Sequence, residues 1–122
     1  MANPENVLVI GASTNEWRYS FIATRMLRDY GHSVICYGKK KGNCAGIPIL
    51  NEFPTGETFD TITLYLNPEN QKQYYQNIVG LKPKRVIFNP GTENPELEVL
   101  LHKEGIESEE ACTLVLLRTN QF

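Results

Sequence analysis

Strand and helix patterns alternate along this 122-residue chain. Three observations make the alternation clear: an apolar run at residues 7–10, a small-residue turn after it, and the tripeptide Asn-Pro-Glu at residues 67–69 and 94–96. In each tripeptide asparagine suits a helix cap, proline the first turn and glutamate the helix dipole. Parallel strands need crossover connections. The pattern therefore predicts an α/β fold, a three-layer, Rossmann-like, doubly wound and mainly parallel sheet in a single domain over residues 1–122.

The first half of the chain supplies two core strands and one helix. After the strand at 7–10, apolar residues recur at helical spacing from about Ser20, the expected cap, up to Gly31, a natural stop. Residues 33–37 are expected to form the second strand, followed by a basic loop over 38–46. Residues 47–49 are expected to form a short edge strand, where Pro48 is tolerated.

The second half repeats the strand and helix pattern. Residues 61–66 are expected to form the third core strand, followed by a helix with Tyr74, Ile78 and Leu81 on one face. A strand at 85–88 precedes a helix that buries Leu97, Leu100 and Leu101. Ile106 and residues 114–117 are interpreted as one or two final strands, and the segment after Arg118 as a tail or an interface.

Composition narrows the class of protein. With 41% hydrophobic and 21% charged residues, the chain is expected to be globular. A net charge of −2 argues against general binding to nucleic acid or membrane surfaces. The three cysteines lack metal-ligand spacing, and neither a signal peptide nor a membrane-spanning run is evident, so a cytoplasmic protein is expected.

Ligands of such sheets bind beyond the carboxyl ends of the strands, where the strand order reverses. The candidate site therefore comprises residues 11–20, the loop after the second strand, Asn67 and Pro68, and the turn Asn89, Pro90 and Gly91. In the first turn, Gly11 can adopt backbone angles closed to other residues, and the helix that follows offers unpaired N–H groups to an anion.

The residues after the second strand indicate the type of nucleotide. Dinucleotide-binding domains usually carry three spaced glycines in the first turn and an acidic residue here that binds the ribose. This chain has Gly11 alone in the first turn, and Lys39, Lys40 and Lys41 at the ribose position. Three lysines favour a phosphorylated ribose, as in NADP or CoA, although a lysine run also serves as a solvated surface patch.

At these positions the chain resembles the stand-alone CoA-binding domain family, whose fold is shared with the N-terminal domain of the succinyl-CoA synthetase α subunit. The resemblance rests on residues 9–13, 18–20, 47–48, 66–69 and 110–112 and on the lysine loop. It implies that the pyrophosphate lies among the first-turn residues, that one of the three lysines meets the 3′-phosphate, and that residues 89–91 line the path of adenosine and pantetheine. The first-turn residues are Gly11, Ala12, Ser13, Arg18 and Ser20.

Other residues have open interpretations. Trp17 offers a face for the adenine or a cover for the phosphates, and a half-exposed structural tryptophan is an equal alternative. The spacing of the histidines, cysteines and carboxylates does not indicate a catalytic triad, an acid pair or a metal cluster.

Three hypotheses about function follow. The leading one is a protein that binds CoA or a short acyl-CoA and does not itself catalyse a reaction. A small NADP-dependent oxidoreductase that uses the same lysine loop is the second. The third is a ligand-free interaction protein in which an exposed region at residues 114–122 forms a homodimer edge or binds another protein.

Overall fold

A single mixed sheet organises the molecule. The computed structural model describes residues 3–122 and contains seven strands in the order β3-β4-β2-β1-β5-β6-β7. Every neighbouring pair is parallel except β3 and β4. The strands are β1 (Asn6–Ile10), β2 (Ser33–Tyr37), β3 (Asn43–Cys44), β4 (Ile47–Leu50), β5 (Thr61–Leu64), β6 (Arg85–Phe88) and β7 (Glu107–Glu110).

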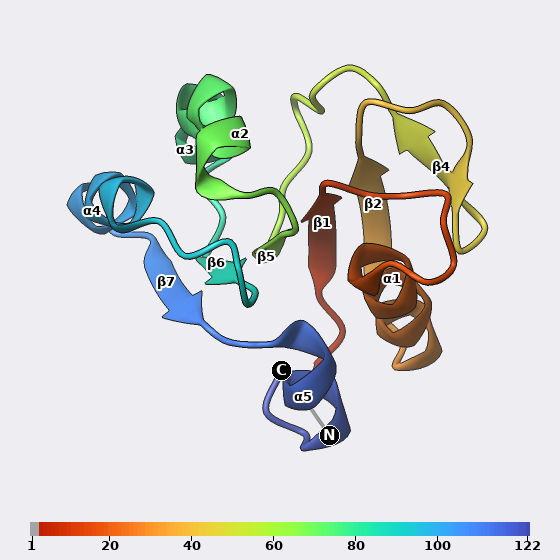
Figure 1. Cartoon of the computed structure of the whole chain (residues 1–122). Coiled ribbons are helices and arrows are strands. Elements are labelled where there is room, and N and C mark those ends of the chain that lie inside the picture. The colour runs from red at the N-terminus through yellow and green to blue at the C-terminus, as the bar shows by residue number, and fades with distance from the viewer. Residues whose placement is uncertain (1–2) are drawn as a thin grey trace.

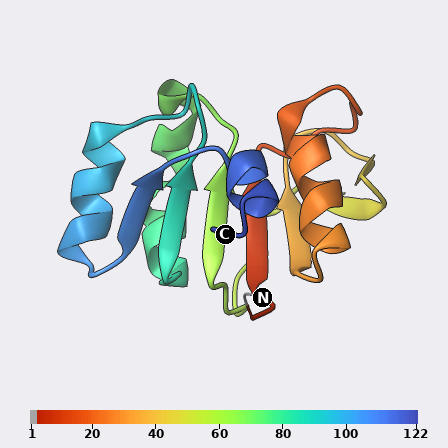
Figure 2. The same ribbon diagram turned by 90° about the horizontal axis from the view of Figure 1, so that it is seen from below.

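Helices cover both faces of the sheet, as Figures 1 and 2 show. One face carries α2, α3 and α4, and the opposite face carries α1 and α5. These helices are α1 (Tyr19–Asp29), α2 (Pro68–Gln71), the 3-10 turn η1 (Lys72–Tyr74), α3 (Tyr75–Leu81), α4 (Pro95–Lys103) and α5 (Thr113–Arg118). The predicted doubly wound, three-layer α/β fold is therefore confirmed.

The alternating side chains of the central strand build two cores. In β1, Leu8 and Ile10 pack toward α3 and α4, whereas Val7 and Val9 pack toward α1 and α5. All four side chains are fully buried. A parallel strand covered on both faces reads as a continuous apolar run, and this is why the opening segment of the chain is so apolar.

Both Asn-Pro-Glu sequences begin helices as predicted. The Asn67 side chain accepts a hydrogen bond from the Asn70 N–H at 2.9 Å, and the Asn94 side chain accepts one from the Leu97 N–H at 3.2 Å. The helix after Asn67 is not continuous, since η1 separates α2 from α3. The expected cap at Ser20 is wrong: the helix begins at Tyr19, and Ser20 is buried inside its first turn.

The last two elements differ in part from the sequence prediction. Residues 114–117 lie in α5, where Leu114 and Leu117 are buried while Val115 is half exposed, a helical spacing. The final strand is β7, which begins directly after Ile106, as the other part of the prediction expected, and its sequence Glu-Ser-Glu-Glu is held by pairing with β6. Polar residues suit this strand because it forms an edge of the sheet. Residues 114–117 thus do not form a strand.

The prediction that residues 47–49 form an edge strand is also wrong. β4 pairs with β2 on one side and with the two-residue β3 on the other. Pro48 is tolerated because the ladder with β2 begins only at Ile49. No helix within residues 3–122 is long and apolar enough to cross a membrane.

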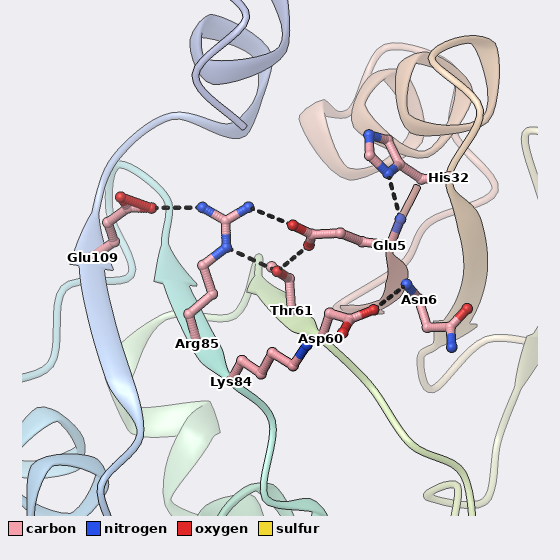
Figure 3. Close-up of polar contacts among 8 residues, drawn as sticks. All are labelled: Glu5, Asn6, His32, Asp60, Thr61, Lys84, Arg85 and Glu109. Atoms are coloured by element: carbon pink, nitrogen blue, oxygen red, sulfur yellow. Dashed lines mark hydrogen bonds and ion pairs between the residues drawn. The ribbon is translucent and has the colours of Figure 1, made fainter. Parts of the chain in front are cut away.

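A polar cluster closes the amino ends of the central strands (Figure 3). The guanidinium of Arg85 donates to Thr61 Oγ1 at 2.8 Å and to Glu109 Oε1 at 3.0 Å, and its Nη2 lies 3.6 Å from Glu5 Oε2. Thr61 in turn donates to Glu5. One arginine therefore links β5, β6 and β7 to the segment before β1.

Candidate ligand-binding site

A cavity opens where the strand order reverses. From β1 the chain continues to β2 on one side, whereas β5 pairs with β1 on the other side. A cavity of about 450 Å³ lies at the carboxyl ends of these strands. It is lined by Gly11, Ala12, Ser13, Arg18, Tyr19, Ser20, Tyr37, Gly38, Lys39, Lys40, Tyr65, Leu66, Asn67, Asn70, Gln73, Tyr74, Pro90, Gly91 and Thr92.

The first wall is the loop between β1 and α1, residues 11–18, which we call the phosphate loop. The backbone N–H groups of Gly11 and Ala12 both donate to the Tyr37 carbonyl at 3.0 Å, and this ties the loop to β2. The Ser13 Oγ accepts the Asn15 N–H at 3.0 Å, so the hydroxyl proton of Ser13 stays available to a ligand. The loop is thus ordered by its own bonds and presents small residues to the cavity.

The helix start behind this loop is open to an anion. The first N–H groups of a helix have no partner within the helix, and Arg18 at the cap position supplies no side-chain cap. Because α1 spans 11 residues, its amino end carries a partial positive charge. Tyr19 and Ser20 line the cavity at this end.

The second wall is the lysine loop. The Asn51 side chain donates to the carbonyls of Gly38 at 2.9 Å and Lys40 at 3.2 Å, and this holds the loop against the cavity. A Cβ at Gly38 would lie 2.7 Å from the Ala12 carbonyl oxygen, so glycine allows the two loops to meet. Lys39 and Lys40 line the cavity, whereas Lys41 does not.

The charged side chains of the lining are all positive. They are Arg18, Lys39 and Lys40, and no carboxylate of residues 3–122 lines the cavity. This is a local concentration of positive charge in a chain whose net charge is −2. Together with the open helix start, these three side chains fit a ligand that carries phosphates.

A third part of the lining was not predicted from the sequence. Tyr74, Asn70 and Gln73 reach the cavity from α2 and η1, and Tyr37 reaches it from the end of β2. The Tyr37 hydroxyl donates to the Tyr74 hydroxyl at 3.0 Å. Burial, followed by this hydrogen bond, raises the pKa of Tyr37 to about 12, so the Tyr37 hydroxyl stays neutral at physiological pH. This part of the lining offers neutral hydrogen-bonding groups and aromatic faces.

Several residues of the expected site lie outside the lining, among them Trp17, Lys41, Pro68 and Asn89. Trp17 is 82% exposed in the loop before α1, and Lys41 is an exposed residue that does not line the cavity. Asn89 is buried: its Nδ2 donates to Thr63 Oγ1 at 2.7 Å and to the Leu64 carbonyl at 2.9 Å. Its Oδ1 accepts the Thr113 N–H at 2.9 Å. Asn89 therefore holds the turn whose Pro90 and Gly91 line the cavity.

The family model described as CoA binding domain matches residues 5–118 of this chain. The chain belongs to the CoA-binding domain family. No curated protein matches it.

Solved structures share the fold of this chain. A crystal structure described as that of an uncharacterized protein is 48% identical, with a TM-score of 0.97 over 99% of this chain and 100% of that chain. A protein from Thermus thermophilus shares the fold at 21% identity, with a TM-score of 0.85 over 98% of this chain and 91% of that chain.

A larger enzyme also contains this fold. The dinucleotide-forming acetyl-coenzyme A synthetase 1 of Ca. Korarchaeum cryptofilum matches at 18% identity, with a TM-score of 0.71. The match covers 89% of this chain and 26% of that chain. At this identity the likeness concerns the fold, which that enzyme uses as one part of a longer chain.

Proposed function

We propose that this domain holds CoA, or a short acyl-CoA, in the cavity at the carboxyl ends of β1, β2 and β5. The observation that carries the proposal is the exclusively positive charge of the lining, provided by Arg18, Lys39 and Lys40 around an open helix start. Membership of the CoA-binding domain family supports the same ligand.

Each part of the ligand has a matching wall. The pyrophosphate would lie over Gly11, Ala12 and Ser13 at the amino end of α1, with Arg18 beside it. The 3′-phosphate of the ribose would meet Lys39 or Lys40. Pro90 and Gly91 also line the cavity, and the pantetheine arm would pass along them.

The proposed role is binding without catalysis by this chain alone. The titratable side chains of the lining are arginine, lysine and tyrosine, and the lining holds no imidazole or carboxylate that would act as a general acid or base near neutral pH. The domain would carry or present the cofactor to a partner in the cytoplasm.

Calorimetric titration with CoA, dephospho-CoA, NADP and NAD tests the proposal. We expect CoA to bind most tightly and to lose affinity on removal of the 3′-phosphate. In the Lys39→Ala/Lys40→Ala variant, CoA should lose about 1–3 kcal/mol of binding free energy, while dephospho-CoA loses much less. Lys41→Ala is the matched control and should bind both ligands like the unmodified protein.

The same titration separates the rival functions. The lysine loop also suits the 2′-phosphate of NADP, so tighter binding of NADP than of CoA would support the oxidoreductase hypothesis instead. Equal weakening of CoA and dephospho-CoA by the lysine variant would contradict the assignment of the lysines to the 3′-phosphate. Binding of none of the four ligands would favour an interaction protein.

A further inference from the structure

Gln71 is a fully buried polar residue beside the ligand cavity. It ends α2 and directly precedes η1, the turn that brings Gln73 and Tyr74 to the cavity. Gln71 itself does not line the cavity. A buried amide needs a hydrogen-bond partner for each of its polar groups, because an unpaired group costs stability. The partners of this side chain therefore indicate what it holds in place.

Both ends of the Gln71 amide are paired. Its Nε2 donates to the Leu66 carbonyl and to the Thr92 carbonyl, each at 2.8 Å. Its Oε1 accepts a hydrogen bond from Asn94 Nδ2 at 2.8 Å. Since a carbonyl oxygen can only accept, the NH2 group must face Leu66 and Thr92. The amide thus has one orientation.

The two carbonyls belong to loops that the sheet no longer holds together. The pairing of β5 with β6 ends at Leu64 and Phe88. Leu66 lies in the loop after β5 and Thr92 in the turn after β6, and both residues line the cavity. Gln71 bridges these loops beyond the end of the ladder. Its length therefore sets the distance between two parts of the lining.

Asn94 fixes the orientation of Gln71. The Asn94 Nδ2 also donates to the Tyr75 hydroxyl at 2.8 Å, and its Oδ1 accepts the Leu97 N–H at 3.2 Å as the cap of α4. Asn94 is only 4% exposed. A buried polar network in which each member is paired is rigid. The start of α4 thus holds the bridge between the two loops.

We propose that Gln71 is a positioning residue that fixes the separation of the Leu66 and Thr92 loops, and that this separation makes the cavity selective for ligands with a pantetheine arm. The inference rests on the proposed function, in which the arm passes along Pro90 and Gly91. Gln71 acts on the arm through the backbone of these loops and does not itself touch the ligand.

The nucleotide end of the ligand is held by groups that Gln71 does not contact. The phosphate loop is tied to the Tyr37 carbonyl at 3.0 Å by two backbone N–H groups, and the Asn51 side chain holds the lysine loop. These hydrogen bonds remain when the Gln71 bridge is removed. Loss of the bridge should therefore weaken binding of the arm and leave binding of the nucleotide unchanged.

Calorimetric titration with CoA and with adenosine 3′,5′-bisphosphate, which lacks the arm, tests this selectivity. We expect the unmodified protein to bind CoA more tightly. Gln71→Met keeps the length and the burial of the side chain and removes its hydrogen bonds. It should weaken CoA binding about fivefold to tenfold and bisphosphate binding by less than about twofold. A merely structural role of Gln71 would weaken both ligands by the same factor.

A second variant disturbs the bridge without changing Gln71. Asn94→Asp keeps an oxygen that caps α4 but replaces the Nδ2 donor with an acceptor. The Gln71 amide then turns its NH2 group toward residue 94 and away from the two carbonyls. We expect the same selective loss of CoA affinity, and this variant decides the question if Gln71→Met does not fold. Gln76→Met, at an exposed position on α3, is the matched control and should bind both ligands normally.

The outcomes separate this inference from the proposed function. CoA binding by the unmodified protein tests the proposed function without any variant. Equal affinity of the unmodified protein for CoA and the bisphosphate would overturn the selectivity and leave CoA binding intact. Equal weakening of both ligands in the folded variants would overturn the positioning role of Gln71. Failure of the unmodified protein to bind either ligand would refute the proposed function and the inference with it.

Discussion

Gly11 supports the phosphate loop because both its backbone and its surroundings exclude a side chain. Its φ is +91°, a conformation that other residues rarely adopt. A Cβ there would lie 2.9 Å from the Tyr65 carbonyl carbon and 3.2 Å from Leu66 Cδ2. The glycine thus lets β1 turn sharply beside β5, the strand on the other side of the switch point.

Gly11→Ala is expected to destabilise the fold as well as the site. Positive φ costs about 1–2 kcal/mol, and the contact with the Tyr65 backbone adds about 1–3 kcal/mol. Gly56→Ala is the matched control, since Gly56 has a φ of +79° and nothing within 4 Å of its Cβ position. Urea unfolding should show the larger loss for Gly11→Ala, and equal losses for the two variants would contradict the steric contribution.

His32 makes the stability of the molecule depend on pH. Its Nδ1 accepts the Glu5 N–H at 3.0 Å, so protonation of this nitrogen breaks the bond. Burial lowers the pKa of His32 from its ordinary value of 6.5, although Glu5 opposes the shift. The stability linked to neutral His32 is therefore fully present above pH 6.5 and declines as the pH falls, because the unfolded chain takes up the proton first.

His32→Asn should remove this pH dependence. Asparagine keeps an acceptor for the Glu5 N–H and does not titrate. We expect the difference in unfolding free energy between the unmodified protein and the variant to change by the greatest amount between pH 7 and the lowered pKa. Urea titrations at a series of pH values measure this difference, and a constant difference would show that His32 does not titrate in this range.

The elements differ in how well the sequence predicts them, and the reasons are physical. The helices after Asn67 and Asn94 begin where predicted because the cap, the proline and the glutamate act within one turn. α5 was misassigned because a run of four apolar residues suits a strand or a helix equally. A strand near Ile106 was expected, but the extent of β7 could not be predicted because this strand is defined by pairing with β6.

In the candidate site too, features set by the local sequence could be predicted, and features set by contacts between distant segments could not. The phosphate loop and the lysines follow strands directly, so their position at the carboxyl edge of the sheet could be predicted. Tyr74 and Gln73 could not, because they reach the cavity only through η1, which interrupts the expected helix. Asn89 also follows a strand, but its side chain turns inward to Thr63 and Thr113.

Asn89 joins β5 and α5, so its loss should affect stability. Asn89→Ala leaves the Thr113 N–H and the Leu64 carbonyl without their side-chain partner in a buried region. We expect a loss of about 2–4 kcal/mol in unfolding free energy. The exposed Asn77 on α3 provides the control, and Asn77→Ala should change stability by less than about 0.5 kcal/mol. Similar values for the two variants in urea unfolding would contradict the bridging role.

In the whole molecule, the two ends of the sheet have different roles: one holds a polar cluster and the other holds the ligand cavity. The amino ends of the strands hold the Glu5, Arg85 and Glu109 cluster, and the Arg85 guanidinium also lies 4.5 Å from the ring centre of Phe122. The carboxyl ends hold the cavity with its lysines. We therefore expect substitutions at the amino ends to change the unfolding free energy without changing CoA affinity. Substitutions of the lysines at the carboxyl ends should do the reverse.

The variants Arg85→Met and Lys40→Ala test this separation. Methionine retains packing but leaves Glu5 without its cation. We expect a loss of about 2–3 kcal/mol in unfolding free energy, less than for a fully buried pair because the Glu109 side chain is 42% exposed. CoA affinity should not change. Lys40→Ala should weaken CoA binding and change stability by less than about 0.5 kcal/mol.

Combining the two substitutions measures whether the amino and carboxyl ends of the sheet are energetically coupled. Arg85 lies at the start of β6, and Lys40 lies in the loop beyond the end of β2, with no shared partner. Effects at such separated positions add to within about 0.5 kcal/mol. We therefore expect the double variant to show the stability loss of Arg85→Met and the CoA affinity of Lys40→Ala. A larger interaction energy in unfolding or calorimetric titration would show that the sheet couples the amino-end cluster to the ligand cavity.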